Sequence, residues 1–388
     1  MAAAMAAAGS TLSQCQSPTQ PGGLSQGAAP DLGREAAALV PAARCGECHG
    51  RTESQWRGSA HAHADTSPLY RAMRLGARTA SCDRCHAPLR AVAAGDPIAA
   101  EGVSCDVCHT ISSVQVGRVG GAGFTLQLDD AVRYGPLCDA KPHYFHTMGC
   151  SPLHEAAEFC AACHNWSVQL PGGGALALYP EYKEWLEESA SGAGTSCQGC
   201  HMPGERAEVA VGWPERSGVP LHSFLGRGDL RRRALIGRAR VSIAAGKLTV
   251  QVALTNSGAG HAVPTGLPER QLRVSVELID NAGRIAAREE HVYGRTLVDS
   301  AGKVVPFYEA TRELADTRIR AGETREDTFV LVAAAVGQLR VSVTWRPISP
   351  SLAAKLGVTP PPDEPVLAAS VALPVKGRND AAALELRL

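Results

Sequence analysis

Large aromatic side chains, excess charge and long apolar runs are all scarce in this 388-residue chain. The 5 Trp, 7 Tyr and 6 Phe residues make up only 5% of the sequence, so aromatic rings alone do not fill a core for this length. Lys and Arg number 38, as do Asp and Glu, which excludes a basic field that would attract nucleic acid or anionic lipid. No apolar run reaches the roughly 18 to 20 residues of a membrane span, so we expect no transmembrane span in the mature chain.

Cysteine and histidine are abundant instead, with 13 residues of each. Five pentapeptides have the form C-x-x-C-H, which is the attachment motif of c-type haem. Two thiols at this spacing add to the two vinyl groups on one porphyrin edge, and the adjacent His becomes the proximal iron ligand. The motifs therefore predict five covalently bound haems, attached through Cys45, Cys48, Cys82, Cys85, Cys105, Cys108, Cys160, Cys163, Cys197 and Cys200 and ligated by His49, His86, His109, His164 and His201.

Zinc is the main alternative for these motifs, because Cys82/Cys85 and Cys105/Cys108 have the spacing of a zinc ribbon. A zinc ribbon needs no His after its Cys pairs, whereas haem attachment does, and all five pairs are followed at once by His. A disulfide within each motif is disfavoured as well, because a C-x-x-C bridge closes a strained small loop. The pattern therefore favours haem.

The first 40 residues are rich in Ala, Gly, Ser, Gln and Pro, and we expect a signal remnant and flexible leader over 1–40. Cys15 follows Leu12-Ser13-Gln14, which loosely resembles a bacterial lipoprotein signal and makes Cys15 a candidate lipidation site. The alternative is an ordinary residue in a discarded leader. Because c-type haem is attached outside the cytoplasm, we expect an exported bacterial protein, either periplasmic or on the outer surface, with a lipid anchor as an option.

The remaining chain divides into two regions of different pattern. Residues 41–225 hold all five motifs with little periodicity, and we expect a loop-rich, mainly helical multihaem domain with helices over Ser67–Leu75 and Pro180–Ser189. Residues 226–388 lack Cys and alternate apolar with polar side chains, which is typical of half-buried strands. About seven short strands predict an immunoglobulin-like β-sandwich, and hence an α + β, two-domain protein. The strand candidates are Ile236–Ala244, Leu248–Leu254, Leu272–Leu278, Thr324–Val332, Leu339–Trp345 and Val366–Leu373.

The two regions carry opposite net charge. Residues 45–225 contain 13 Lys and Arg against 19 Asp and Glu, whereas residues 226–388 contain 23 against 17. Opposite charge favours docking of the two halves. The run Arg231-Arg232-Arg233 at the junction has two interpretations, a partner for haem propionates or a solvated basic linker.

Histidine supply exceeds the demand for distal iron ligands. Five haems leave five distal positions, and only 5 Met residues are present, so we expect mostly bis-His ligation with correspondingly low potentials. His291 lies in the alternating region far from any motif, and we expect it to be structural. The histidines outside the motifs are His61, His63, His143, His146, His154, His222, His261 and His291.

The motif regions resemble the multihaem c-type cytochromes related to the tetrahaem electron carrier of ammonia oxidisers. The similar segments are CGECHGRTESQWRGSAHAHA, GVSCDVCHT, YGP, EFCAACHN and EYKEWLEES followed by SCQGCHMP, within about residues 45–270. The resemblance implies that His61 is a distal ligand, with His63 as the competing choice. It also implies distal roles for His222, in the segment HSFLG, and for His261, close to the start of the β domain.

Three histidines compete for the two remaining distal positions. We expect His146, which follows a loop containing Pro and aromatic residues, and His154, which precedes the fourth motif in an expected short helix. His143 is then a plain loop residue. Cys138 and Cys150 enclose 11 residues around this loop, and in an oxidising compartment we expect a disulfide between them.

The predicted function is electron transfer, with closely spaced haems acting as a relay to redox partner proteins. The alternative is a multihaem oxidoreductase acting on a small nitrogen or sulfur compound, which requires one iron with an open position and acid/base groups beside it. Because no motif marks such a site, we expect an electron carrier rather than an enzyme. The β domain also has an expected role in docking to an outer-membrane conduit or to neighbouring copies, and the sequence does not separate a shuttle from a conduit or filament subunit.

Overall fold

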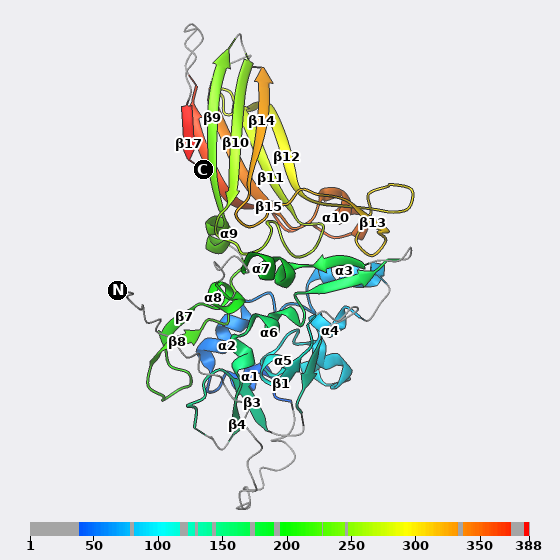
Figure 1. Ribbon diagram of the computed structural model, residues 1–388, viewed down its shortest axis with the longest axis vertical. Helices are drawn as coiled ribbons and strands as arrows, with labels where there is room; N and C mark the ends of the chain where they lie inside the picture. Colours follow the sequence, from blue (N-terminus) through cyan, green and yellow to red (C-terminus); the bar gives the residue numbers. More distant parts are fainter. Residues whose placement is uncertain are drawn as a thin grey trace, which may run out of the picture.

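The computed structural model describes residues 39–77, 81–116, 123–128, 131–141, 145–170, 175–189, 195–226, 228–244, 247–332, 337–373 and 384–387. Cys15 and His143 lie outside these residues. The molecule is elongated, with short helices and strands at one end and long strands at the other (Figure 1). In the described part of the chain, no helix is long and apolar enough to cross a membrane.

Short helices and short strand pairs build the N-terminal half, and its longest helix has ten residues. Pro begins each 3-10 helix (η), where its missing N–H costs no hydrogen bond. The helices are α1 (Ala42–Cys45), α2 (Gly50–Arg57), α3 (Pro68–Ala77), α4 (Asp83–His86), η1 (Pro88–Ala91), η2 (Pro97–Ala100), α5 (Cys105–His109), η3 (Pro152–Glu155), α6 (Ala157–Ala161), α7 (Glu181–Ser189) and α8 (Cys197–His201). Helices α3 and α7 lie where the sequence predicted them.

Paired strands separate these helices, and the sequence did not predict them. Each has five residues or fewer, which is too short for a visible alternation. The pairs β1/β2, β5/β6 and β7/β8 are antiparallel, and β3/β4 is parallel. The strands are β1 (Ile111–Val114), β2 (Phe124–Leu126), β3 (Val132–Gly135), β4 (Thr147–Cys150), β5 (Trp166–Gln169), β6 (Ala175–Tyr179), β7 (Gly204–Ala207) and β8 (Arg216–Pro220).

Two antiparallel sheets form most of the C-terminal half. Their strand orders are β14-β10-β9-β17 and β13-β12-β11-β15-β16 among the described residues. The elements are α9 (Asp229–Ala234), β9 (Leu235–Ala244), β10 (Lys247–Asn256), β11 (Gln271–Ile279), β12 (Ile285–Val298), β13 (Arg312–Asp316), β14 (Thr324–Val332), β15 (Gln338–Arg346), α10 (Pro350–Leu356), β16 (Glu364–Ala372) and β17 (Leu384–Arg387).

Alternating apolar residues of both sheets meet in one core. Val241 on β9, Val250 on β10, Val274 on β11 and Val343 on β15 are completely buried in it. Because successive side chains of a strand point to opposite faces, the intervening residues of β9 face solvent, whereas Ser275 and Glu277 of β11 are buried on the second face as well. Burial along β9 alternates strictly from Leu235 to Ser242, so the period-two pattern of the sequence marks these strands to within two residues.

The longest strand, β12, was not among the predicted strands. Most of its first eight residues are exposed, and Arg288, Glu289 and Glu290 follow one another within it. A strand with so little buried surface has no alternation to detect, and its position is set by pairing with β11 over residues 285–294.

A second core joins the two halves of the chain. Met73 on α3 and Leu178 on β6 pack with Phe307, Ile348 and other apolar residues from the C-terminal half. An ion pair adds to this contact, because Arg318 Nη2 lies 2.7 Å from Glu184 Oε1 on α7. The other Glu184 oxygen accepts the Ala262 N–H at 3.0 Å. The haem-motif half is therefore held against the β half by apolar and charged groups together.

Candidate cofactor site

Each C-x-x-C-H motif sits in a single helical turn. The His N–H donates to the carbonyl of the first Cys at 2.9 Å for His49, 3.1 Å for His86 and 2.9 Å for His164. Residues three and four positions apart share one face of such a turn, so the two thiols and the imidazole point the same way. The hydroxyl of Ser196 adds a cap by accepting the Gly199 N–H at 3.2 Å. Local sequence is therefore enough to prepare each attachment site.

All five motifs line one continuous cavity of about 2770 Å³. This is about 550 Å³ for each motif, within the roughly 300–1,000 Å³ of a cofactor site. In addition to the motif cysteines and histidines, the residues that line it include His61, His63, His146, His154, His222 and His261. Among the described residues, no group of three or more His, Cys, Asp or Glu side chains is arranged to hold a single metal ion.

Four of the motif histidines each face a second imidazole across this cavity. The ring centres are 6.3 Å apart for His49 and His146, 6.3 Å for His61 and His164, 6.2 Å for His109 and His222, and 6.3 Å for His201 and His261. A metal–nitrogen bond of roughly 2 Å on each side places two imidazole centres about 6 Å apart. The spacing of all four pairs therefore fits an iron between the rings.

Backbone carbonyls orient these imidazoles. Nδ1 lies 2.7 Å from the Val209 oxygen in His49 and 2.6 Å from the Tyr134 oxygen in His109. Nδ1 of His201 contacts the Leu225 oxygen in the same way. A hydrogen bond at Nδ1 fixes the tautomer and leaves the Nε2 lone pair for a metal.

Burial favours the neutral form of several of these histidines. Burial, assisted by the charges of neighbouring histidines, lowers the pKa of His61 to about 3 and that of His222 to about 4. Burial also lowers the pKa of His109 and His201. A neutral imidazole is the form that binds iron.

The sequence left two choices between histidines open, His61 or His63 and His143 or His146, and the structure bears on each in a different way. His63 lines the cavity but is an exposed side chain, whereas His61, two residues earlier, faces His164. His146 faces His49, and its competitor His143 lies outside the described residues.

His154 is placed differently from the other expected distal ligands. Its ring centre lies 5.7 Å from that of His109, which already faces His222. Its Nε2 lies 3.1 Å from the Cys108 carbonyl oxygen, and its buried Nδ1 has no partner. The structure therefore gives His154 no motif histidine of its own, because His109 already faces His222.

His86 has an aromatic neighbour instead of a second imidazole. The Tyr70 ring stacks on it with centres 4.2 Å apart, and in the described part of the chain no other ring contacts His86. Tyr70 donates to Asp83 at 2.5 Å, and Arg74 binds the same carboxylate at 2.6 and 2.7 Å. Although burial raises the pKa of Asp83, hydrogen bonds from Arg74, Tyr70 and Arg90 hold it at about 2. Sequence analysis did not identify Tyr70 or Asp83, because neither belongs to a motif.

Thiols of different motifs lie close to one another. The thiols of Cys45 and Cys105, of Cys85 and Cys163, and of Cys160 and Cys197 are close enough to shift one another's pKa. Cys108 lies near enough to Cys160 and Cys163 to raise the pKa of both thiols. The five motifs therefore form one connected cluster.

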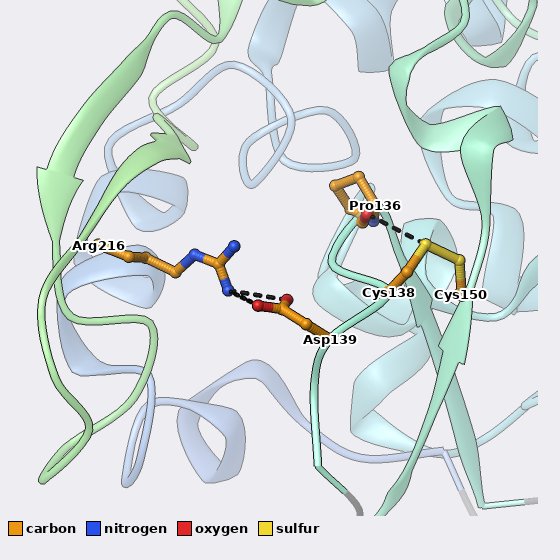
Figure 2. Close-up of a disulfide and its surroundings, with 5 residues drawn as sticks. All are labelled: Pro136, Cys138, Asp139, Cys150 and Arg216. Atoms are coloured by element: carbon orange, nitrogen blue, oxygen red, sulfur yellow. Dashed lines mark hydrogen bonds and ion pairs between the residues drawn. A yellow bond between two sulfur atoms is a disulfide. The ribbon is translucent and has the colours of Figure 1, made fainter.

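A disulfide closes the loop that carries His146. Cys138 and Cys150, the pair singled out in the sequence, are joined, and β3 and β4 run parallel beside the bond (Figure 2). Figure 2 also shows the neighbouring Asp139 carboxylate, which accepts hydrogen bonds from Arg216 Nη1 at 2.9 and 3.0 Å. The disulfide thus ties the two ends of the loop together, and the ion pair of Asp139 with Arg216 attaches the loop next to Cys138.

The remaining sequence candidates lie at the β half. His291 on β12 pairs through Nδ1 with Asp327 at 2.6 Å and does not line the cavity. Arg231 is largely buried: it pairs with Glu364, and its guanidinium carbon lies 3.4 Å from the ring centre of Trp345. The first Arg of the basic run therefore anchors α9 to the β half.

Comparison with known proteins finds a likeness among solved structures. No family model matches the chain, and no curated protein is significantly similar to it. Among solved structures, the penta-heme cytochrome c552 from Thermochromatium tepidum superimposes with a TM-score of 0.71 and 23% sequence identity. The match covers 86% of this chain and 99% of that chain, so this chain is similar in fold to almost the whole of that penta-heme cytochrome.

Proposed function

We propose that this chain is an exported multihaem c-type cytochrome that carries electrons along five covalently attached haems. The observation that carries the proposal is the set of four imidazole pairs at 6.2–6.3 Å in the cavity that the five attachment motifs line. Haem iron supplies one-electron redox chemistry, and its potential depends on axial ligands and burial. The fold shared with a penta-heme cytochrome supports the same conclusion.

The proposed distal ligands are His146 for the motif at Cys45, His222 for the motif at Cys105, His61 for the motif at Cys160 and His261 for the motif at Cys197. The motif at Cys82 receives no distal His. This assignment keeps four of the five distal ligands expected from the sequence. His154 instead bonds to the backbone beside His109.

The thiol contacts support an order for the relay. Cys45 and Cys105 shift each other's pKa, Cys108 raises the pKa of Cys160 and Cys163, and Cys160 and Cys197 shift each other's pKa, so these thiols lie near one another in this order. We therefore place the motifs at Cys45, Cys105, Cys160 and Cys197 in one series. The motif at Cys82 joins the series at the motif of Cys160, through the Cys85–Cys163 contact.

Location and partners follow from the same proposal. Covalent haem attachment takes place outside the cytoplasm, so the protein is placed in the periplasm or on the outer surface of a bacterium. Its partners are redox proteins. We further propose that residues 226–388 form an immunoglobulin-like domain, because two sheets share one core there. Docking of this domain to a conduit or a neighbouring copy is part of the same proposal.

The first test counts haems and sorts their spin states. Pyridine haemochrome assay together with low-temperature EPR of the oxidised protein is expected to give five haems per chain, four of them low-spin and one high-spin. Fewer than five haems would contradict the count. Five low-spin haems would contradict the open position at the motif of Cys82.

A second candidate function is supported by the same open position. An iron ligated by His86 alone has room for a small nitrogen or sulfur compound, as an oxidoreductase requires. The test is oxidation of a reduced viologen by the holoprotein in the presence of nitrite, hydroxylamine or sulfite. If none of these compounds oxidises the dye while the high-spin signal is present, the protein is a carrier and not an oxidoreductase of this class.

A further inference from the structure

Four strands lie at the edges of the two sheets of the β half, and three of them have features that hinder further pairing. β17 has only four residues, and β13 has five, with a register shift where it pairs with β12. β16 contains Pro365, which has no N–H to donate, and it pairs with β15 across another register shift. Short strands, Pro and irregular pairing are features that keep sheet edges from pairing with other chains.

The fourth edge strand, β14, has none of these features. It pairs with β10 in unbroken register along all nine of its residues, and among the described strands it has no neighbour on its other side. Residues 329–336 contain no charged residue, Pro or Gly, which is typical of segments that pair readily with other strands. Of the described edges, β14 is therefore the one best suited to accept another strand.

The first half of β14 is tied to β12 of the opposite sheet. The Tyr293 hydroxyl donates to Asp327, and His291 Nδ1 pairs with the same carboxylate at 2.6 Å. Asp327 points inward, on the same face of the strand as the buried Phe329, and an inward-pointing charge protects an edge. The second half, Thr328–Val332, lies at the end of the molecule away from the haem-motif half (Figure 1).

Two apolar side chains of this second half face solvent. Val330 is 50% exposed and Val332 is 70% exposed, whereas Phe329 and Leu331 are buried in the core. Val favours strands, and its side chain gains free energy when a facing residue on a neighbouring strand covers it. A further strand beside β14 would therefore cover apolar surface and satisfy backbone groups at the same time.

The segment is complementary to its own copy. Two copies of β14 related by a two-fold axis normal to the sheet pair antiparallel, and each side chain keeps its face of the sheet. Facing residues are then an even number of positions apart, so the register is centred on a residue. The register centred on Val330 places Val330 opposite its own copy and Thr328 opposite Val332. On the inner face it places Phe329 opposite Leu331.

Charge does not oppose this pairing. No charged residue lies within Thr328–Val332, and the whole chain has equal numbers of acidic and basic residues, so two copies do not repel each other through net charge. Pairing over so short a segment buries less than the roughly 1,200 Å² of a stable interface, so the contact suits a weak, reversible dimer.

We propose that a second copy of this chain pairs with Thr328–Val332 of β14 and joins the four-stranded sheets of two protomers into one. This inference rests on the proposed function in one respect, because it names the surface through which the β half meets a neighbouring copy. It does not depend on the number of haems. Since the paired segment lies away from the haem motifs, both haem-motif halves of the dimer stay free for redox partners.

The first test measures association of the holoprotein by analytical ultracentrifugation over a range of concentrations. The wild type is expected to show a reversible monomer–dimer equilibrium. Val330→Lys is expected to raise the dimer dissociation constant at least about tenfold, because it places two positive charges opposite each other at the two-fold axis. The matched control is Val304→Lys, because Val304 is 66% exposed and lies between β12 and β13. Haem content and circular dichroism show whether each variant is loaded and folded.

Cysteine substitutions test the register. Val330→Cys is expected to form a covalent dimer on air oxidation, because directly facing residues of an antiparallel pair lie within reach of a disulfide. Val332→Cys faces Thr328 of the other copy and is expected to stay unlinked. A covalent dimer from Val332→Cys and none from Val330→Cys would overturn the register centred on Val330.

Two further outcomes overturn the inference and leave the proposed function in place. A wild-type protein with five haems that stays monomeric at every concentration would leave the edge of β14 to a strand of a different protein. A dimer that Val330→Lys does not weaken would place the interface elsewhere on the molecule. A dimer that forms as expected but carries fewer than five haems per chain would instead contradict the proposed function alone.

Discussion

Tyr70 lies flat against His86, with ring centres 4.2 Å apart and planes inclined by 13°, and its hydroxyl donates to the buried Asp83. Tyr70 is thus a positioning residue for this imidazole. The His86 Nδ1 contact to the Ala64 oxygen is 3.3 Å, longer than the 2.6–2.7 Å found at His109 and His49. Because this backbone contact is longer and weaker, the stacked Tyr70 ring contributes more to holding His86 in position.

Two substitutions separate the hydroxyl of Tyr70 from its ring. Tyr70→Phe removes one charged hydrogen bond but keeps the stack, and we expect it to lower the free energy of unfolding by about 2 kcal/mol with the high-spin signal unchanged. Tyr70→Leu also removes the ring, and we expect a broadened or shifted high-spin EPR signal. Guanidinium unfolding and EPR of the holoproteins check both changes. Identical spectra for Tyr70→Leu and wild type would contradict the positioning role.

The different placements of His146 and His154 predict opposite spectroscopic results. His146→Ala removes the partner of His49 and is expected to convert one low-spin haem to high-spin. His154→Ala is expected to leave the number of low-spin haems unchanged, because its Nε2 contacts the Cys108 carbonyl. Spin quantification by EPR compares the two variants, and each serves as the control for the other. Loss of a low-spin signal in His154→Ala would restore the five-pair assignment expected from the sequence.

The disulfide is expected to stabilise the segment that carries His146. Replacing both Cys138 and Cys150 by Ser reopens a loop of about 12 residues, for which chain entropy predicts a loss of roughly 3 kcal/mol. The thioether bonds of attached haem resist reduction, so a phosphine reductant gives the same comparison in the wild-type protein. Thermal unfolding is measured with and without the reductant. Equal stability under both conditions would show that the disulfide does not brace the ligand loop.

Stability in acid depends on Glu277, which is buried on β11 and accepts hydrogen bonds from Arg288 at 2.8 Å and Arg340 at 2.7 Å. Burial raises the pKa of Glu277, but the two arginines outweigh it and the pKa is lowered. A carboxylate with a lowered folded pKa stabilises the fold above its unfolded pKa of about 4.3. This contribution is lost as the pH falls below that value toward the folded pKa.

Glu277→Gln is therefore expected to cost about 1–3 kcal/mol at pH 7 and to flatten the decline in stability between about pH 5 and 3. Urea unfolding across this pH range makes the measurement. Glu289→Gln, at an exposed position of β12, is the control. The same pH slope in wild type and Glu277→Gln would show that the Arg288–Glu277–Arg340 group does not contribute.

The local parts of the molecule were determined by the sequence itself. Each C-x-x-C-H motif defines its own helical turn, because hydrogen bonds within five residues aim the thiols and the imidazole. The alternation at Leu248–Leu254 marks a strand for the same reason, since every second side chain must be buried. These features need no information from distant residues.

The tertiary structure decided which histidines meet. His61 and His63 have the same chemistry and lie two residues apart, and only the packing of their turn turns one toward His164. His154 has a motif close by in sequence, yet a carbonyl takes its Nε2. Arg270 and Trp166 are over 100 positions apart, and both reach the cavity because the β half packs on β6 and α7. Contacts between residues so far apart in sequence depend on how the two halves pack together. A local sequence pattern carries no information about that packing.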